Sequence, residues 1–414
     1  MRRDVWLALL LAVLAAWGLR RTVLEGFVYA WPREFRGDFY AAMYVPDWWD
    51  GRGIMYGPVF VLERWLVNAW PKIFTIYTFA LANVPAVALA LVLSLRAVRA
   101  TRRTAWVVVT AWCCFQWLFY AFSVAANPEI LEMLLLTAAW YAAARAKATA
   151  AWVAVVVAGL TKVFPIIFAP LLILRASRRA MVAGAVTAVA IIAVVGVGQQ
   201  LSPVETAKAI LIPIQSTSGT TLPQASQHLG TFLIPVPSAN QLMGLNTALA
   251  RAFNMGDSDP RLAAVQTITN TATVLIYVWS VFVAFVVLRG RHALSEVTRL
   301  ALAYGLFLAL MPLATFHAHP HTFVFMLPAW TAIVATLADD EDRTRAVRCG
   351  AAFVVLFVLG GLPSVATPID RLWHTRWATW LGRDPIWASI GVVFALSGYA
   401  LVRTRELRAA LQTS

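Results

Sequence analysis

The sequence contains few charged residues for its length. Charged side chains make up 13% of the 414 residues, whereas hydrophobic residues make up 60% and the mean hydropathy is +0.71. Apolar runs of roughly 18 or more residues are typical of membrane helices rather than of soluble domains. The composition therefore excludes a water-soluble protein and predicts an all-α polytopic membrane protein.

Cysteine and lysine are also scarce. The three cysteines, Cys113, Cys114 and Cys349, all lie within apolar runs, and their spacing supports neither a disulfide framework nor a zinc site. The formal charge is +14 and comes almost entirely from arginine. These charges cluster in short loops between apolar runs, a pattern that the positive-inside rule explains better than binding to nucleic acid does.

We expect about twelve membrane spans, each near the ~20 residues that a bilayer requires. The first run ends at Arg20 and Arg21 without a small-residue cleavage site, so it reads as an uncleaved helix rather than a secretory signal. Two short spans form a broken or re-entrant pair around Lys162 and Pro165. The predicted spans are residues 5–19, 73–95, 105–121, 129–144, 148–161, 163–174, 180–198, 268–288, 298–315, 322–338, 349–362 and 386–402.

An N-terminus in the cytoplasm places most of the 34 arginine and lysine residues in inside loops, as the positive-inside rule requires. Both termini are then cytoplasmic, and the protein is predicted to lie in the plasma membrane of a prokaryote. Three long loops face outward, at residues 20–72, 199–267 and 363–385. We find no internal repeat of the kind many transporters contain, so residues 1–414 read as a single integral membrane domain.

Residues 240–253, in the second outer loop, have the pattern of an interfacial helix that lies on the membrane. Arg251 is nine residues beyond Leu242 and therefore faces the opposite side, which it shares with Asn240 and Gly244. The apolar stripe at helical spacing consists of Leu242, Leu245, Leu249 and Phe253.

Asp38 is the predicted catalytic residue. It follows the first span, in the stretch Gly37-Asp38-Phe39-Tyr40, and a carboxylate at the membrane rim is suited to accept a proton from a substrate hydroxyl. Partial desolvation there would make it more basic. The alternatives are that Asp38 caps a helix, or that Asp47 or Asp50 is the base instead.

Lys162 lies between two apolar runs, where a lysine at mid-membrane costs roughly 2.5–3.5 kcal/mol on insertion scales. The cost falls if it reaches the interface or meets an anion, so the hypotheses are simple snorkelling and contact with a lipid phosphate. Glu129 begins the fourth predicted span. It either binds sugar hydroxyls or caps the helix, and we favour capping because negative charge is favourable near a helix N-terminus.

Half of the six histidines lie close together, as His317, His319 and His321. Three imidazoles are able to bind zinc, but alternate histidines interrupted by Pro320 match no zinc motif well. Hydrogen bonding to phosphate or sugar is the favoured role, and at least one histidine is expected to be structural. We therefore predict no metal and no cofactor, with a divalent ion kept as an alternative.

These elements, in this order, resemble the lipid-linked-sugar-dependent transferases of the GT-C superfamily. The best match is glycosyltransferase family 87, which includes polyprenyl-phosphate-mannose-dependent α-mannosyltransferases of phosphatidylinositol mannosides. Two positions depart from the family pattern: the turn Ala126-Asn127-Pro128-Glu129, where relatives often have Gly-Gln-x-Asn, and Leu242, where a serine is usual. The landmarks are Asp38-Phe39 with Gly53, Tyr56 and Pro58, Lys162 with Pro165 and Pro170, Asn240-Gln241 with Arg251, and His317 to His321 before Leu327-Pro328.

The resemblance implies a GT-C fold and a polyprenyl-phosphate sugar donor. Asp38 would deprotonate a hydroxyl of a glycolipid or polysaccharide acceptor, and attack would invert a β-linked donor to an α-linked product. Mannose is the favoured sugar and arabinofuranose the alternative; a lipid or solute transporter is the rival class. Besides membrane lipid, no protein or nucleic-acid partner is inferred. The predicted donor- and substrate-binding residues are Lys162, His317, His319, His321, Arg251, Tyr40, Tyr56, Asn240, Gln241 and Glu129.

Overall fold

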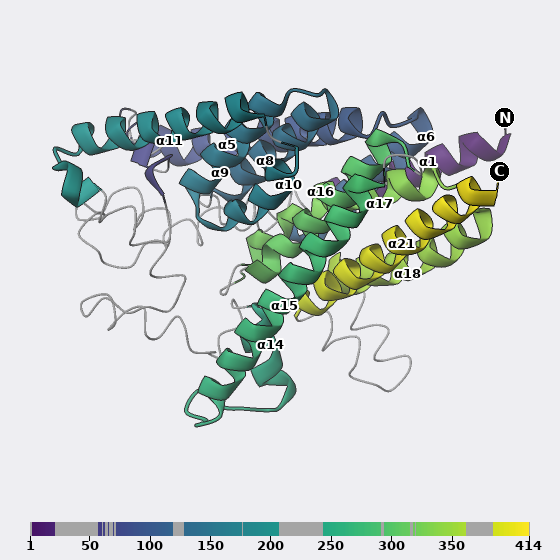
Figure 1. Ribbon diagram of the computed structural model, residues 1–414. Helices are drawn as coiled ribbons and strands as arrows, with labels where there is room; N and C mark the ends of the chain where they lie inside the picture. The colour runs from purple at the N-terminus through teal and green to yellow at the C-terminus, as the bar shows by residue number, and fades with distance from the viewer. Residues whose placement is uncertain are drawn as a thin grey trace.

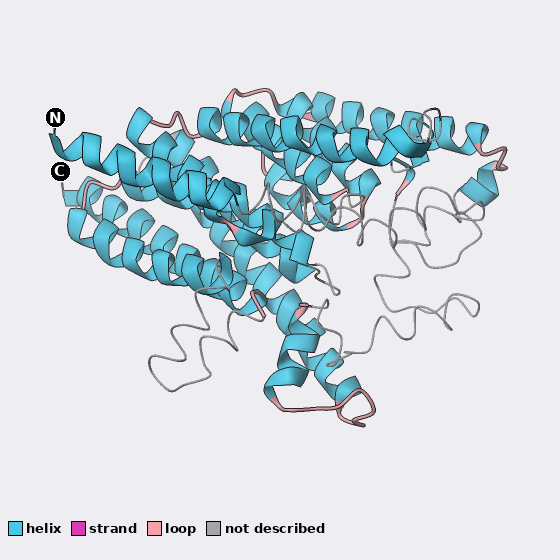
Figure 2. Ribbon diagram, turned by 180° about the vertical axis from the view of Figure 1, so that it is seen from behind, coloured by secondary structure: helices cyan, strands magenta, loops and turns pink. Residues whose placement is uncertain are grey.

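The computed structural model contains helices and no strand in the part of the chain that it describes (Figure 2). Most of the three long loops predicted to face outward lies outside that part. The described residues are 2–20, 57–59, 61–62, 65, 69, 72–118, 128–175, 177–206, 243–290, 294–314, 318, 320–361 and 384–413.

Each of the twelve predicted spans contains at least part of a helix of the structure. At residues 105–121 the helix ends at Cys114, because Phe115 turns the backbone to an extended conformation. At residues 386–402 the helix instead continues to Thr413. The helices are α1 (Arg2–Arg20), α5 (Lys72–Ala97), α6 (Arg102–Cys114), α8 (Glu129–Ala144), α9 (Ala148–Thr161), η2 (Phe164–Phe168), α10 (Ala169–Ile173), α11 (Arg178–Gly198), α14 (Leu245–Ala252), α15 (Leu262–Arg289), α16 (Glu296–Ala314), η3 (Pro320–Phe325), α17 (Met326–Ala338), α18 (Arg343–Gly361) and α21 (Ile386–Thr413).

Six helical stretches in the described residues are long and apolar enough to cross a membrane, so the chain is an all-α membrane protein. Four shorter apolar helices accompany them. The expected number of about twelve spans is not confirmed. The helices α6, α8, α9 and the η2–α10 pair fall short of a full crossing length, and α1 and α5 contribute only the shorter apolar stretches Trp6–Arg20 and Asn83–Ala97. The six are Arg178–Gly198, Leu262–Arg289, Glu296–Ala314, His321–Ala338, Arg343–Gly361 and Ile386–Arg405.

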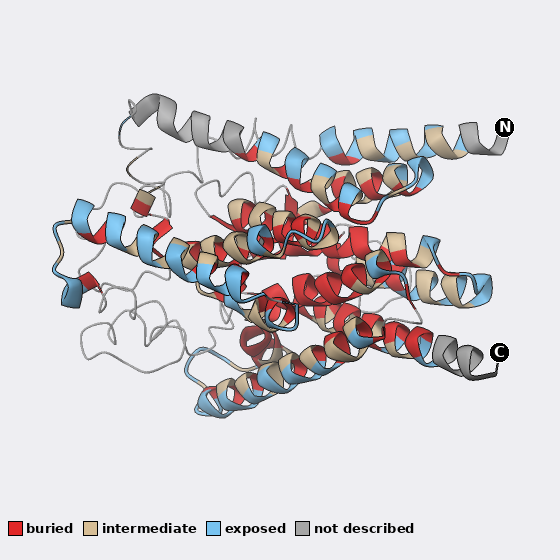
Figure 3. Cartoon of the chain, turned by 45° about the horizontal axis from the view of Figure 1, so that its top comes forward, coloured by how far each residue is buried: buried red, intermediate tan, exposed pale blue. Residues whose placement is uncertain are grey.

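The centre of the bundle is formed by α16 and α17. In their most apolar stretches 89% and 83% of the residues are buried, compared with 22% in α11 and α15 and 17% in α18 (Figure 3). The outer helices thus leave many apolar side chains exposed, as expected where lipid replaces water. The two central helices approach closely at Gly305, whose added Cβ would lie 2.7 Å from Cβ of Ala332.

Both termini lie at the same end of the bundle (Figure 1). Four short connections between helices lie at that end as well: α5 to α6, α8 to α9, α15 to α16 and α17 to α18. Two pockets bring them together. One is lined by residues 98–104, 295–301 and 335–339, and the other by residues 143–148 and 288–296. We call it the basic end, because its loops are rich in arginine. The starts of α8 and α21 and the end of α9 lie at the opposite end, which we call the polar end.

Candidate functional site

Three charged or titratable side chains from distant segments meet at the polar end. Glu129 is the first residue of α8, Lys162 follows the last residue of α9, and His321 lies in η3. The Lys162 ammonium forms an ion pair with Oε1 of Glu129, and Nε2 of His321 lies 3.4 Å from the same oxygen. All three residues are at least 94% buried. We call this group the Lys162 cluster.

A break between two helices sets the position of Lys162. Its backbone is extended, with φ −147° and ψ 147°, although its N–H still donates to the carbonyl of Ala158 and so closes the last turn of α9. The 3-10 helix η2 follows, with Pro165 in its first turn. The predicted break around Lys162 and Pro165 is therefore present, and it turns the lysine inward toward α8.

The segment around Gly57 packs directly against this break. The Gly57 N–H donates to the carbonyl of Thr161 at 2.7 Å. A Cβ at Gly57 would collide with the carbonyl oxygen of Leu160, so no larger residue fits without a backbone shift. The part of the first long loop at Gly57 is thus held beside Lys162.

Glu129 lies in the first turn of α8, where a negative charge was expected, but the partners of its carboxylate lie on other segments. The N-cap residue is Pro128, and it makes no side-chain capping bond. The Glu129 carboxylate instead turns to Lys162 and His321. A buried charge is strongly unfavourable unless it is paired, so the carboxylate and the ammonium stabilise each other in a region from which water is excluded.

Arg251 belongs to a second buried ion pair, with Asp384, which lies two residues before the start of α21. The interfacial helix predicted at residues 240–253 is shorter, spanning Leu245–Ala252. Its polar side, predicted to face away from an apolar stripe on the membrane, is buried against the protein, whereas Phe253 is 60% exposed. The polar side of α14 is buried because Arg251 pairs with Asp384, which is fully buried and needs a nearby cation.

The two ion pairs are linked through the backbone. The N–H of Met243, just before α14, donates to the carbonyl of Ala318 at 2.6 Å. Ala318 lies three residues before His321, so the segment that carries Arg251 is held against the segment that carries the histidines. The polar end thus gathers parts of the chain that are far apart in sequence.

Sequence reasoning missed Asp384 and Glu132. Glu132 lies one turn beyond Glu129 and is 1% exposed. The sequence marks both positions: Glu132 is an acidic residue inside an apolar span, and Asp384 lies two residues before another span. Ionisable residues in such places are expensive and are usually functional or paired. Arg251, the partner of Asp384, lies 133 residues away in the chain, so this pairing was invisible in the sequence.

Seven of the predicted site residues lie outside the described part of the chain, including the predicted base. Within the residues that the structure does describe, no group of three or more His, Cys, Asp or Glu side chains could hold a metal ion. The seven residues are Asp38, Tyr40, Tyr56, Asn240, Gln241, His317 and His319.

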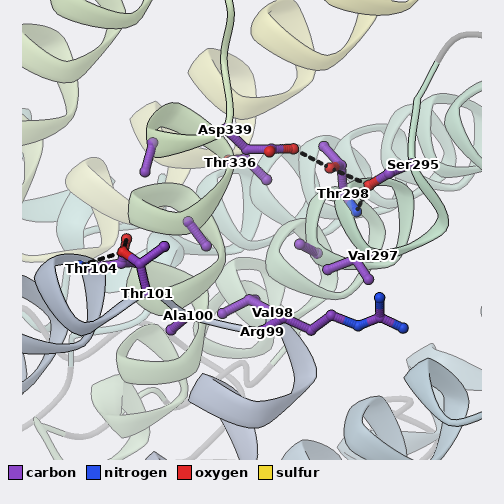
Figure 4. A pocket seen from close by; sticks show the side chains of 13 residues that line it. Val98, Arg99, Ala100, Thr101, Thr104, Ser295, Val297, Thr298, Thr336 and Asp339 are labelled. Carbon is purple, nitrogen blue, oxygen red and sulfur yellow. Dashed lines mark hydrogen bonds between the residues drawn. The ribbon is translucent and has the colours of Figure 1, made fainter.

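A pocket of about 280 Å³ lies at the basic end, away from the Lys162 cluster (Figure 4). Its polar lining consists largely of helix caps. Thr101 accepts a hydrogen bond from the backbone of Thr104 at the start of α6, and Ser295 does the same for Thr298 at the start of α16. Thr298 also donates to Asp339 at 2.7 Å. These polar groups therefore already serve the helix ends.

The fold and the site define a polytopic helical membrane protein with a buried, charged group at one end of its bundle. The sequence model of glycosyltransferase family 87 matches residues 55–315, which is more than half of the chain. The chain belongs to this family and is a GT-C-type glycosyltransferase. No curated protein and no solved structure matches it. Glu129, Lys162 and Arg251 lie inside the matched stretch; Asp38, His321 and Asp384 lie outside it.

Proposed function

We propose that this glycosyltransferase moves mannose from a polyprenyl-phosphate donor to a hydroxyl of a glycolipid or polysaccharide acceptor. The reaction takes place on the outer face of a prokaryotic plasma membrane, with both termini in the cytoplasm. Two findings support the proposal: the family assignment, and the positive-inside rule, which puts the basic end in the cytoplasm. The polar end, with the Lys162 cluster, then faces outward.

In this mechanism Asp38 takes the proton of the acceptor hydroxyl as the oxygen attacks the anomeric carbon. The bond from that carbon to the phosphate oxygen breaks, and its electron pair leaves with polyprenyl phosphate. A β-linked donor therefore yields an α-linked product. A positioned base typically contributes about 10²–10⁴-fold to such a transfer.

The leaving phosphate gains a negative charge, and cations held in a water-poor site stabilise it most strongly. The observation that carries the proposal is the buried Lys162 cluster, which places an ammonium and an imidazole on one carboxylate oxygen. Glu129 keeps Lys162 charged and oriented, and His321 offers a second donor. Arg251, held by Asp384, assists from α14.

The predicted residues outside the described part of the chain complete the proposed site. We assign His317 and His319 to the leaving phosphate. Tyr40, Tyr56, Asn240 and Gln241 are assigned to the sugar and the lipid headgroup. The family assignment does not favour the rival interpretation as a transporter, since it indicates sugar transfer.

The decisive experiment supplies vesicles that contain the purified protein with polyprenyl-phosphate mannose or polyprenyl-phosphate arabinose. We expect transfer from the mannose donor, and a loss of about 10²–10⁴-fold in Asp38→Asn with donor binding retained. The matched controls are Asp47→Asn and Asp50→Asn, which should keep most activity. Transfer only from the arabinose donor would overturn the assignment of mannose as the transferred sugar. Full activity of Asp38→Asn would overturn the assignment of Asp38 as the catalytic base.

A further inference from the structure

An apolar groove of about 430 Å³ runs between α6, α17 and α18, toward the basic end. Its walls are formed by Val107 and Ala111 of α6, Ile333 of α17, and Gly350 and Val354 of α18. It is separate from the Lys162 cluster, because none of the three cluster residues lines it. A groove with this lining suits a hydrocarbon chain.

Each outer wall of the groove ends in an arginine. Arg103, Val107 and Ala111 are four residues apart and share one face of α6. Arg343 lines the groove itself, at the start of α18. Both arginines are exposed, and neither takes part in an ion pair within the residues that the structure describes.

Of the four acidic side chains at residues 339–342, three are already engaged, Asp342 by the backbone N–H groups of Thr344 and Arg345. The fourth, Glu341, is exposed and forms no ion pair with Arg103 or Arg343 within the described residues. Asp340 is bound to Arg345, and Asp339 lies 3.7 Å from Arg403 and accepts a hydrogen bond from Thr298. The positive charge at the mouth of the groove is therefore not neutralised from within the described part of the chain. Basic residues at a membrane surface attract anionic lipids, each contributing on the order of a tenfold gain or less in affinity.

We propose that this groove binds one anionic phospholipid from the leaflet at the basic end, with an acyl chain along its walls and the phosphate between Arg103 and Arg343. The length of the groove fits one leaflet. From Arg343 to Phe357 the helix rises by fourteen steps of ~1.5 Å, or roughly 21 Å, which is close to half of the ~40–45 Å bilayer including headgroups. The proposal does not depend on which sugar the enzyme transfers.

The inner end of the groove is closed by aromatic rings. Trp330, which lines the groove, packs against Phe357 with ring centroids 5.2 Å apart and against Phe353 at 6.5 Å. Phe357 in turn contacts Phe115, just beyond α6. A bound acyl chain would complete the packing between these helices, so lipid binding should raise the unfolding temperature.

The test uses the full-length protein, stripped of lipid in detergent and titrated with phosphatidylglycerol or phosphatidylcholine under native mass spectrometry. We expect one tightly held phosphatidylglycerol, about tenfold preferred over phosphatidylcholine. The double variant Arg103→Gln/Arg343→Gln should lose that preference. Arg178→Gln is the matched control, because Arg178 is an exposed first residue of α11 at the same end.

A second variant tests the groove rather than the charge. A Cβ at Gly350 would meet only Leu337, at 3.9 Å, so Gly350→Leu should fold and fill the groove. We expect it to weaken binding of both lipids about tenfold. Gly398→Leu is its control, because nothing lies within 4 Å of a Cβ there.

Three results would overturn the proposal. One is a wild-type protein that binds the two phospholipids equally. Another is an Arg103→Gln/Arg343→Gln or Gly350→Leu protein that binds phosphatidylglycerol as the wild type does. The third is displacement of the bound phospholipid by polyprenyl phosphate at lower concentration, which would assign the groove to the donor's tail.

Discussion

At the scale of single residues, the pairing of Lys162 with Glu129 changes what the lysine can do. A solitary lysine between two apolar runs was expected either to reach the interface or to meet a lipid phosphate. The buried ion pair supplies a third arrangement, in which the protein itself provides the counter-ion. Lys162 then remains charged while the site is empty, and this charge is what a departing phosphate would require.

The pair makes a prediction that separates stability from catalysis. Glu129→Gln leaves the Lys162 ammonium buried without its carboxylate, so we expect a loss of about 3–5 kcal/mol in the free energy of unfolding. The double variant Glu129→Leu/Lys162→Met removes both charges and should recover most of that stability. Thermal unfolding in detergent measures both.

The same double variant tests the proposed role of Lys162. Although folded, it should transfer sugar at least about tenfold more slowly than the wild type, because no ammonium remains to stabilise the phosphate. If the restored protein transferred sugar at the wild-type rate, Lys162 would be a structural residue only.

At the scale of helices, the bundle depends on close contact between its two central members. Gly305 of α16 faces Ala332 of α17, and no side chain fits between them. Gly305→Ala should therefore cost about 1–3 kcal/mol through overpacking. The control Gly398→Ala introduces the same methyl group where there is open space, and it should be neutral or slightly stabilising. Equal unfolding temperatures for the two variants would contradict this account of the α16–α17 contact.

The connection between α17 and α18 is held by Asp340. Its carboxylate accepts hydrogen bonds from Arg345 and, at 2.9 Å, from the hydroxyl of Tyr399. Burial alone would raise the pKa of Asp340, but these hydrogen bonds and the nearby Arg403 outweigh it and lower the pKa below the usual value. The ionised form is thus favoured more in the folded protein than in the unfolded chain.

The lowered pKa of Asp340 determines how the stability of the protein changes with pH. The stabilisation is fully present above the unfolded pKa of about 3.9, and it is lost as the pH falls through the lower, folded pKa. The wild-type protein should therefore lose unfolding temperature on acidification from about pH 6 to about pH 3. Asp340→Asn should start lower at about pH 6 and lose less over that range; an identical pH profile would exclude this role for Asp340.

At the scale of the whole molecule, orientation in the membrane decides whether the proposed chemistry is outside the cell. Ser258 lies in the exposed turn between α14 and α15 at the polar end, and Glu341 lies between α17 and α18 at the basic end. In a background without Cys113, Cys114 and Cys349, Ser258→Cys should react with a membrane-impermeant maleimide added to intact cells. Glu341→Cys should react only after permeabilisation. The reverse pattern would place the Lys162 cluster in the cytoplasm.

Much of the helical framework followed from the sequence alone, because the apolar composition of a membrane helix is a local property. The bounds of α8 and α9 agree with the predicted spans 129–144 and 148–161. The helix break at Lys162 was also visible locally, through a charged residue followed by Pro165. The short length of α6 was not, since the extended backbone at Phe115 has no such marker.

The order of apolar and charged residues along the chain was enough to determine the class of the protein, the helical segments and the clustering of positive charge in short loops. Only the tertiary structure decided which charges meet. Lys162 and Glu129 are 33 residues apart, and Arg251 and Asp384 are 133 apart. Hydropathy reports the environment that each residue prefers, but a buried charge is stabilised by one particular partner. That partner is chosen by the packing of helices, so it appears only once the bundle is assembled.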